Sequence, residues 1–238
     1  MEQLVLLPGF LCDSAVWRHQ LTGLSDLAQI TVADYGPSDS LGAMAERVLA
    51  ATTGPFAVAG HSMGGRVVLE IYRRAPDRVR GLGLFNTGCK PKPVGETGDR
   101  EAAGRYALLE IAKTAGMRAM GLTWLPPMVH PDRMSDTVLV EEILAMFGRK
   151  TPAIQAAQIN ALLGRPDAVE VVQSIHCPSL LLSGAQDGFS GPDVHAEMAA
   201  WIPGSQLAII ENSGHMAPME QPADVTAAMR RWLNEITQ

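Results

Sequence analysis

The chain has 238 residues and 47% of them are hydrophobic, which is enough for one large α/β domain with a substantial core. Its formal net charge is −6 and no basic cluster follows a nucleic-acid backbone, so we expect no nucleic-acid partner. The three cysteines are widely spaced and no run is long enough to span a membrane, so we expect a cytoplasmic protein without membrane insertion, bound metal or cofactor.

Short apolar runs alternate with amphipathic stretches along the chain, a pattern typical of a mainly parallel sheet with helices on both faces. The predicted strands cover residues 3–7, 29–33, 56–59, 81–85, 179–183 and 206–210. The predicted helices of this layer cover residues 14–24, 41–51, 63–74, 192–201 and 223–236. We therefore expect an α/β fold whose six strands are all parallel.

The stretch 86–177 breaks this alternation because it contains no convincing strand. Its helical patterns cover residues 100–115, 117–125, 134–147, 152–163 and 168–175. Ordinary crossover helices would explain part of it, but one crossover needs far less chain. We predict a core formed by residues 1–85 and 178–238, and a helical cap formed by residues 86–177.

Residues 60–65 read Gly-His-Ser-Met-Gly-Gly, between a predicted strand and a predicted helix. A glycine-x-serine-x-glycine turn in this context is a nucleophile elbow, in which a sharp turn exposes the hydroxyl of Ser62. The helix that follows directs its first N–H groups to the same place, where they stabilise a developing negative charge. The alternative is a passive turn with Ser62 as a helix cap.

A serine hydroxyl needs a base, and the base needs an acid that orients it. His215 follows the last predicted strand and Asp187 follows the preceding one, so both should lie with Ser62 at the carboxyl edge of the sheet. Asp193 is the competing acid, but it lies at a predicted helix start. For His61, inside the turn, a structural role is favoured.

These motifs give the chain a resemblance to α/β-hydrolases that carry a lid, a group with carboxylesterases, enol-lactone hydrolases and carbon–carbon bond hydrolases. The resemblance covers nearly the whole chain and includes the order of Ser62, Asp187 and His215. One departure is Pro8-Gly9, where the family usually has His-Gly. The oxyanion hole is predicted to consist of the main-chain N–H groups of Phe10 and Met63.

The predicted cap contributes Met120, Trp124 and Met128 as candidate substrate-binding residues. Methionine adapts to varied shapes, which favours a permissive apolar acyl pocket. The alternative is that these side chains only attach the cap to the core.

The sequence therefore predicts a serine hydrolase that cleaves a small, largely apolar carboxylic ester or lactone through an acyl-enzyme. The rival is a carbon–carbon bond hydrolase or lyase, because Ser62 to Arg66 resembles the serine-glycine-glycine-arginine stretch of the menaquinone-pathway synthase, where the arginine aids an acidic substrate. A remote alternative is a non-catalytic ligand receptor, which an intact set of Ser62, Asp187 and His215 argues against.

Overall fold

A single twisted sheet forms the centre of the molecule in the computed structural model, which describes residues 1–237. Its six strands lie in the order β2-β1-β3-β4-β5-β6, and every neighbouring pair is parallel. The strands are β1 (Glu2–Leu7), β2 (Ala28–Val32), β3 (Phe56–His61), β4 (Val79–Phe85), β5 (Ser179–Gly184) and β6 (Gln206–Ile210). The predicted six-stranded, all-parallel α/β fold is confirmed.

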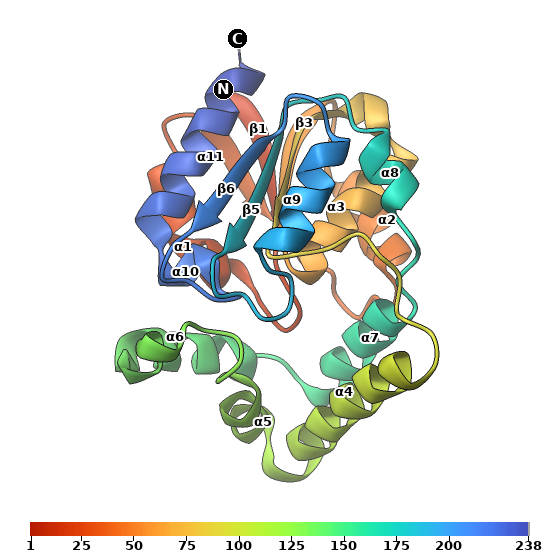
Figure 1. Cartoon of the computed structure of the whole chain (residues 1–238), viewed down its shortest axis with the longest axis vertical. Helices are drawn as coiled ribbons and strands as arrows, with labels where there is room; N and C mark the ends of the chain where they lie inside the picture. The colour runs from red at the N-terminus through yellow and green to blue at the C-terminus, as the bar shows by residue number, and fades with distance from the viewer. Residues whose placement is uncertain (238) are drawn as a thin grey trace.

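Helices cover both faces of this sheet (Figure 1). One face carries α1 (Arg18–Gly23) and α11 (Pro222–Ile236), which contact each other. The other carries α2 (Leu41–Ala51), α3 (Met63–Arg74), α8 (Val169–Gln173) and α9 (Pro192–Trp201). Because both faces are covered, every residue of β3 is buried.

Local signals set several helix boundaries. Ser40 accepts a hydrogen bond from the N–H of Ala43 and so caps α2, and Pro192 occupies the first position of α9. The helix predicted over residues 14–24 is instead divided into a short 3-10 helix, η1 (Ser14–Trp17), and α1. The division falls at Trp17, whose backbone leaves the helical region and whose side chain is fully buried. Two more 3-10 turns are η2 (Pro76–Arg78) and η3 (Pro131–Ser135).

The segment 86–177 contains helices and no strand among the described residues. Its long helices are α4 (Glu96–Ala115), α5 (Met117–Trp124), α6 (Thr137–Gly148) and α7 (Pro152–Leu163). Figure 1 shows these four at one end of the molecule, beyond the ends to which the arrows of β5 and β6 point. The fifth helix, α8, contacts α3 and α9 instead and lies beside the sheet.

Candidate active site

The turn between β3 and α3 has a strained backbone. Ser62 has φ 54° and ψ −116°, a left-handed conformation that costs energy for any residue with a side chain. A β-carbon on Gly60 would overlap the backbone of Gly64, and one on Gly64 would overlap the carbonyl of Leu7. Glycine is therefore required at both positions. This close packing holds the Ser62 hydroxyl at the cavity surface.

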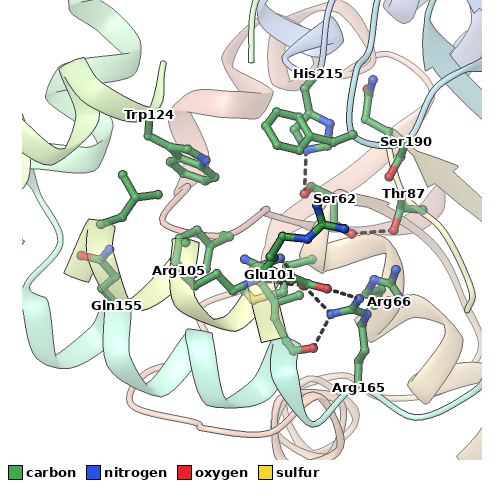
Figure 2. Close-up of a pocket in the computed structure, with 18 residues that line it drawn as sticks. Ser62, Arg66, Thr87, Glu101, Arg105, Trp124, Gln155, Arg165, Ser190 and His215 are labelled. Carbon is green, nitrogen blue, oxygen red and sulfur yellow. Dashed lines mark hydrogen bonds and ion pairs between the residues drawn. The ribbon is translucent and has the colours of Figure 1, made fainter. Parts of the chain in front are cut away.

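The structure brings Ser62, His215 and Asp187 together. His215 Nε2 lies 2.8 Å from Ser62 Oγ, and His215 Nδ1 lies 2.9 and 3.0 Å from the two carboxylate oxygens of Asp187 (Figure 2). Burial opposes ionisation of Asp187, but the charge and hydrogen bond of His215 outweigh it and hold the pKa of that carboxyl below its usual range. An ionised Asp187 accepts a hydrogen bond from the Nδ1–H of His215, which leaves Nε2 free to accept a hydrogen bond from the Ser62 hydroxyl.

The carboxylate of Asp187 is also held by groups outside the predicted set. Asn86 Nδ2 donates to Asp187 Oδ2 at 3.0 Å, and the N–H of Phe189 donates to Oδ1 at 2.8 Å. Asn86 directly follows β4 and has φ 49°. A polar residue directly after a strand, at the carboxyl edge of a parallel sheet, was the signal that could have identified it. Asp193 lies in the first turn of α9.

The loop that carries His215 is fixed at its main chain. The N–H of His215 donates to the carbonyl of Met128 at 2.7 Å, and His61 Nε2 lies 2.7 Å from the carbonyl of His215. Glu220 accepts from the N–H groups of Gly214 and Met216, both at 3.0 Å. The helical turn α10 (Ala217–Glu220), absent from the predicted elements, places this carboxylate under the loop.

The two predicted oxyanion residues both line the cavity. Within residues 1–237, neither the Phe10 N–H nor the Met63 N–H donates a hydrogen bond to another protein group. Next to Phe10, the N–H of Leu11 donates to Gln158 Oε1 at 2.7 Å, and the Tyr35 hydroxyl donates to the carbonyl of Pro8 at 2.9 Å. These bonds fix the loop while the Phe10 N–H remains free to bind a ligand oxygen.

A cavity of about 450 Å³ opens above Ser62, large enough for a small organic molecule. Trp124 lines it, as predicted, and its ring packs edge-on against Phe10 at 5.2 Å. Met120 and Met128 do not line it. Both side chains are buried in the apolar interior. Met120 lies in α5, which packs against α6, and Met128 follows this helix and accepts the N–H of His215 at its carbonyl. The structure therefore gives no support to the prediction that these two methionines contact substrate.

One wall of the cavity is basic, and the predicted pocket was largely apolar. Arg66, Arg105, Arg165 and Glu101 lie together on this wall (Figure 2). Arg165 and Arg105 both pair with Glu101, at 2.7 and 3.0 Å. Although burial opposes it, these arginines lower the pKa of Glu101 to about 2. Glu101 is therefore an anion, and it is shared by two guanidinium groups, those of Arg105 and Arg165.

Arg66 has no carboxylate within ion-pair distance in the part of the chain that the structure describes. Within residues 1–237 its side chain bonds only to the carbonyl of Lys90, at 2.9 Å. Burial, with the nearby charge of Arg165, lowers the pKa of Arg66 to about 10, which still leaves it charged at neutral pH. Arg66 could be singled out from its motif, but Arg105 in α4 and Arg165 after α7 join it only in the tertiary structure.

The sequence profile described as the alpha/beta hydrolase family matches residues 4–229. This chain belongs to that family. The hydrolase is 26% identical to the (E)-2-((N-methylformamido)methylene)succinate hydrolase of Acinetobacter baylyi, over 98% of this chain and 90% of that protein. It is 25% identical to the pimeloyl-[acyl-carrier protein] methyl ester esterase of Aliivibrio fischeri, over 98% and 94% of the two chains.

Solved structures agree with this assignment. A thermophilic esterase from Thermogutta terrifontis superposes with a TM-score of 0.88 at 27% identity, over 100% of this chain and 91% of the other. The enol-lactonase of Burkholderia xenovorans, at 21% identity, has a TM-score of 0.84 over 99% and 92% of the two chains and shares the fold.

No helix among residues 1–237 of the hydrolase is long and apolar enough to cross a membrane. In the same range, no three histidine, cysteine or acidic side chains converge in a way that could hold a metal ion.

Proposed function

We propose that this protein is a serine hydrolase that cleaves a small carboxylic ester or lactone through an acyl-enzyme on Ser62. The observation that carries the proposal is the 2.8 Å contact between His215 Nε2 and Ser62 Oγ, with Asp187 on the other nitrogen of the same ring. A nucleophile bonded to its base, and a base bonded to an orienting acid, is the arrangement that activates a serine hydroxyl.

The reaction divides into two transfers. Ser62 Oγ attacks the carbonyl carbon as its proton moves to His215 Nε2, and the carbonyl oxygen becomes an oxyanion held by the N–H groups of Phe10 and Met63. His215 then gives that proton to the leaving alcohol oxygen as the ester bond breaks. A water molecule, deprotonated by His215, attacks the acyl carbon and restores Ser62 with release of the acid.

The sequence favoured a largely apolar ester, but the arginines on the cavity wall favour an acidic one. We propose that the acid part carries a carboxylate, which is received by Arg66. A partly buried arginine without an anionic partner favours a ligand that supplies one. One relative is named for a substrate with free carboxylates, a substituted succinate.

Carbon–carbon bond cleavage is the second candidate, and one observation favours it. Arg66, the residue that suggested an acidic substrate of that class, lines the cavity with Ser62. The same nucleophile, base and oxyanion donors would serve either reaction, so only the substrate distinguishes them.

Labelling with a fluorophosphonate tests the nucleophile. Wild-type protein is expected to react and to hydrolyse p-nitrophenyl butyrate, and Ser62→Ala is expected to lose both, with a fall in rate of roughly 10⁴-fold or more. Ser190→Ala is the matched control, since Ser190 also lines the cavity and should leave the protein reactive to the label. Labelling that persists in Ser62→Ala would overturn the proposal.

Two methyl esters test the carboxylate. Monomethyl adipate differs from methyl hexanoate only by a carboxylate in place of the terminal methyl group. We expect a higher kcat/KM for monomethyl adipate, and we expect Arg66→Met to remove the preference while hydrolysis of methyl hexanoate continues. A ring-fission dienone carboxylate in the same assay tests carbon–carbon bond cleavage. If kcat/KM for the dienone exceeds the values for both esters, carbon–carbon bond cleavage is the better assignment.

A further inference from the structure

Gln155 is a buried amide without a hydrogen-bond partner. Its side chain is 0% exposed, and neither Nε2 nor Oε1 bonds to any group among residues 1–237. Gln20 and Asn86 each have one unpartnered amide atom, but in the described chain only Gln155 lacks a partner at both. Buried polar groups are normally paired, because leaving one unpaired costs stability. The exception at Gln155 therefore calls for an explanation.

The unpaired amide lies on the substrate cavity. Gln155 is in the first turns of α7 and lines the same cavity as Ser62 and Trp124. Its neighbour on the next turn, Gln158, is also buried but is paired, since its Oε1 accepts the N–H of Leu11 at 2.7 Å. One glutamine of α7 thus supports the fold, and the other, which lines the cavity, has both of its polar atoms buried without a partner among the described residues.

Gln155 lies away from Arg66 and Arg165, although Arg105 lies near it. Figure 2 shows Gln155 beyond Arg105 at the left of the view, whereas Arg66 and Arg165 lie to the lower right of Ser62. The rest of the cavity lining includes apolar side chains of Leu108, Leu162 and Trp124. The cavity therefore offers two polar places on different sides of the nucleophile, one cationic and one neutral.

We propose that Gln155 forms a neutral subsite that binds a carboxamide group of the substrate. This inference deepens the proposed function and rests on it for the identity of the reaction. Gln155 Nε2 would donate to the carbonyl oxygen of the carboxamide, and Gln155 Oε1 would accept from its N–H. The residue would then determine specificity without taking part in bond cleavage.

The chemistry of the amide distinguishes the possible ligands. A carboxamide supplies one acceptor and one donor side by side, which matches both free atoms of Gln155. A carboxylate only accepts, so it would place negative charge against Oε1 and gain less than it does at the arginines. An alkyl group would leave both atoms of Gln155 unpaired, and a site with unpaired polar groups rejects such a ligand.

Binding of matched small ligands tests the subsite. Pentanamide and butyl methyl ketone have nearly the same shape and differ by an NH₂ group in place of a methyl group. Dissociation constants are measured by ligand-observed NMR titration on protein that carries Ser62→Ala, so that the result does not depend on catalysis. We expect pentanamide to bind at least about 10-fold more tightly than the ketone.

Gln155→Met, which keeps the length of the side chain, should reduce this ratio to about one. Gln206→Met, far from the cavity on β6, is the control and should leave the ratio unchanged. The melting temperature of Gln155→Met should equal or exceed that of the parent protein, because the change removes an unpaired buried amide. Equal binding of the two ligands, a ratio that survives Gln155→Met, or a fall in melting temperature would each overturn the subsite.

The experiments distinguish a failure of the proposed reaction from a failure of the subsite. If fluorophosphonate labelling and ester hydrolysis are absent but the amide preference depends on Gln155, the subsite stands and the proposed reaction is wrong. If labelling and hydrolysis are present but the preference is absent, only the subsite is wrong.

Discussion

The imidazole of His61 bonds to the main chain of His215. His61 Nε2 lies 2.7 Å from the carbonyl oxygen of His215, and a carbonyl only accepts, so Nε2 carries the proton. His61 is fully buried, and its Nδ1 has no partner among the described residues. Burial, with the charge of His215, lowers the pKa of His61 to about 3, so this ring stays neutral. His61 is thus a positioning residue for the proposed base.

Replacement of His61 tests this role. His61→Phe removes the donor, leaves the His215 carbonyl unpaired and should lower kcat for p-nitrophenyl butyrate about 10-fold with little change in KM, because substrate does not touch His61. His61→Gln, which keeps an N–H donor, should recover part of kcat. A phenylalanine variant with normal kcat would show that the bond does not position His215.

Stability should fall on mild acidification. His61 takes up a proton near pH 6.5 in the unfolded chain but near pH 3 in the folded protein, so its contribution to stability is complete above pH 6.5 and is lost as pH falls below it. The expected loss is about 1 kcal/mol between pH 7.5 and 5.5. Burial also lowers the pKa of His195, which adds to the loss.

Urea unfolding at pH 7.5, 6.5 and 5.5 measures this dependence. Burial raises the pKa of Glu220, so protonation of Glu220 favours the folded state as pH falls and opposes the effect of His61. The comparison with His61→Phe isolates the contribution of His61. The variant should lose less stability than the wild type over the same range. Parallel curves for the two proteins would contradict the prediction.

Asn86 should support the acid of the site. Its Nδ2 donates to Asp187 at 3.0 Å and lies 3.2 Å from the carbonyl of Gly214. Asn86→Asp places a second carboxylate against Asp187, which should raise the pKa of Asp187 and lower kcat at least about 10-fold. The pH–rate profile should show its acidic limb moved to higher pH. Asn86→Ala removes the hydrogen bond without adding a charge. It should lower kcat but shift the acidic limb of the pH–rate profile less than Asn86→Asp does.

Glu220 should be important for folding of the His215 loop. Its two oxygens accept three main-chain N–H groups, from Gly214, Met216 and His130, at 3.0, 3.0 and 2.7 Å. Glu220→Ala leaves these donors unpaired in the interior and should lower the free energy of unfolding by about 3 kcal/mol. Glu235→Ala, on the exposed part of α11, is the control. Denaturant unfolding that gives equal stabilities for the two variants would refute this role.

Much of the fold could be predicted from local signals. Helices α2, α3, α7 and α9 have the predicted bounds, and Ser40 caps the first of them. The strands are near-continuous apolar runs, because a parallel sheet is covered on both faces. Ser62, Asp187 and His215 could be placed together because each follows a strand, and parallel strands end at one edge of the sheet.

The cavity wall could not be predicted in this way. Met120 was favoured for its chemistry, but α5 has more than one apolar side, and packing against α6 buries Met120 in the interior. Arg66, Arg105 and Arg165 come from three separate parts of the chain, and no local pattern relates them.

The sequence by itself therefore determined the sheet, the sharp turn at Ser62 and the edge where the three candidate catalytic residues meet, because short-range propensities and the direction of parallel strands fix these features. Only the tertiary structure decided which side chains surround the substrate, such as Arg165 and Gln155. Helices of the segment 86–177 can rotate about their axes without changing their pattern, and the packing of α4 against α7 selects the face that meets the cavity.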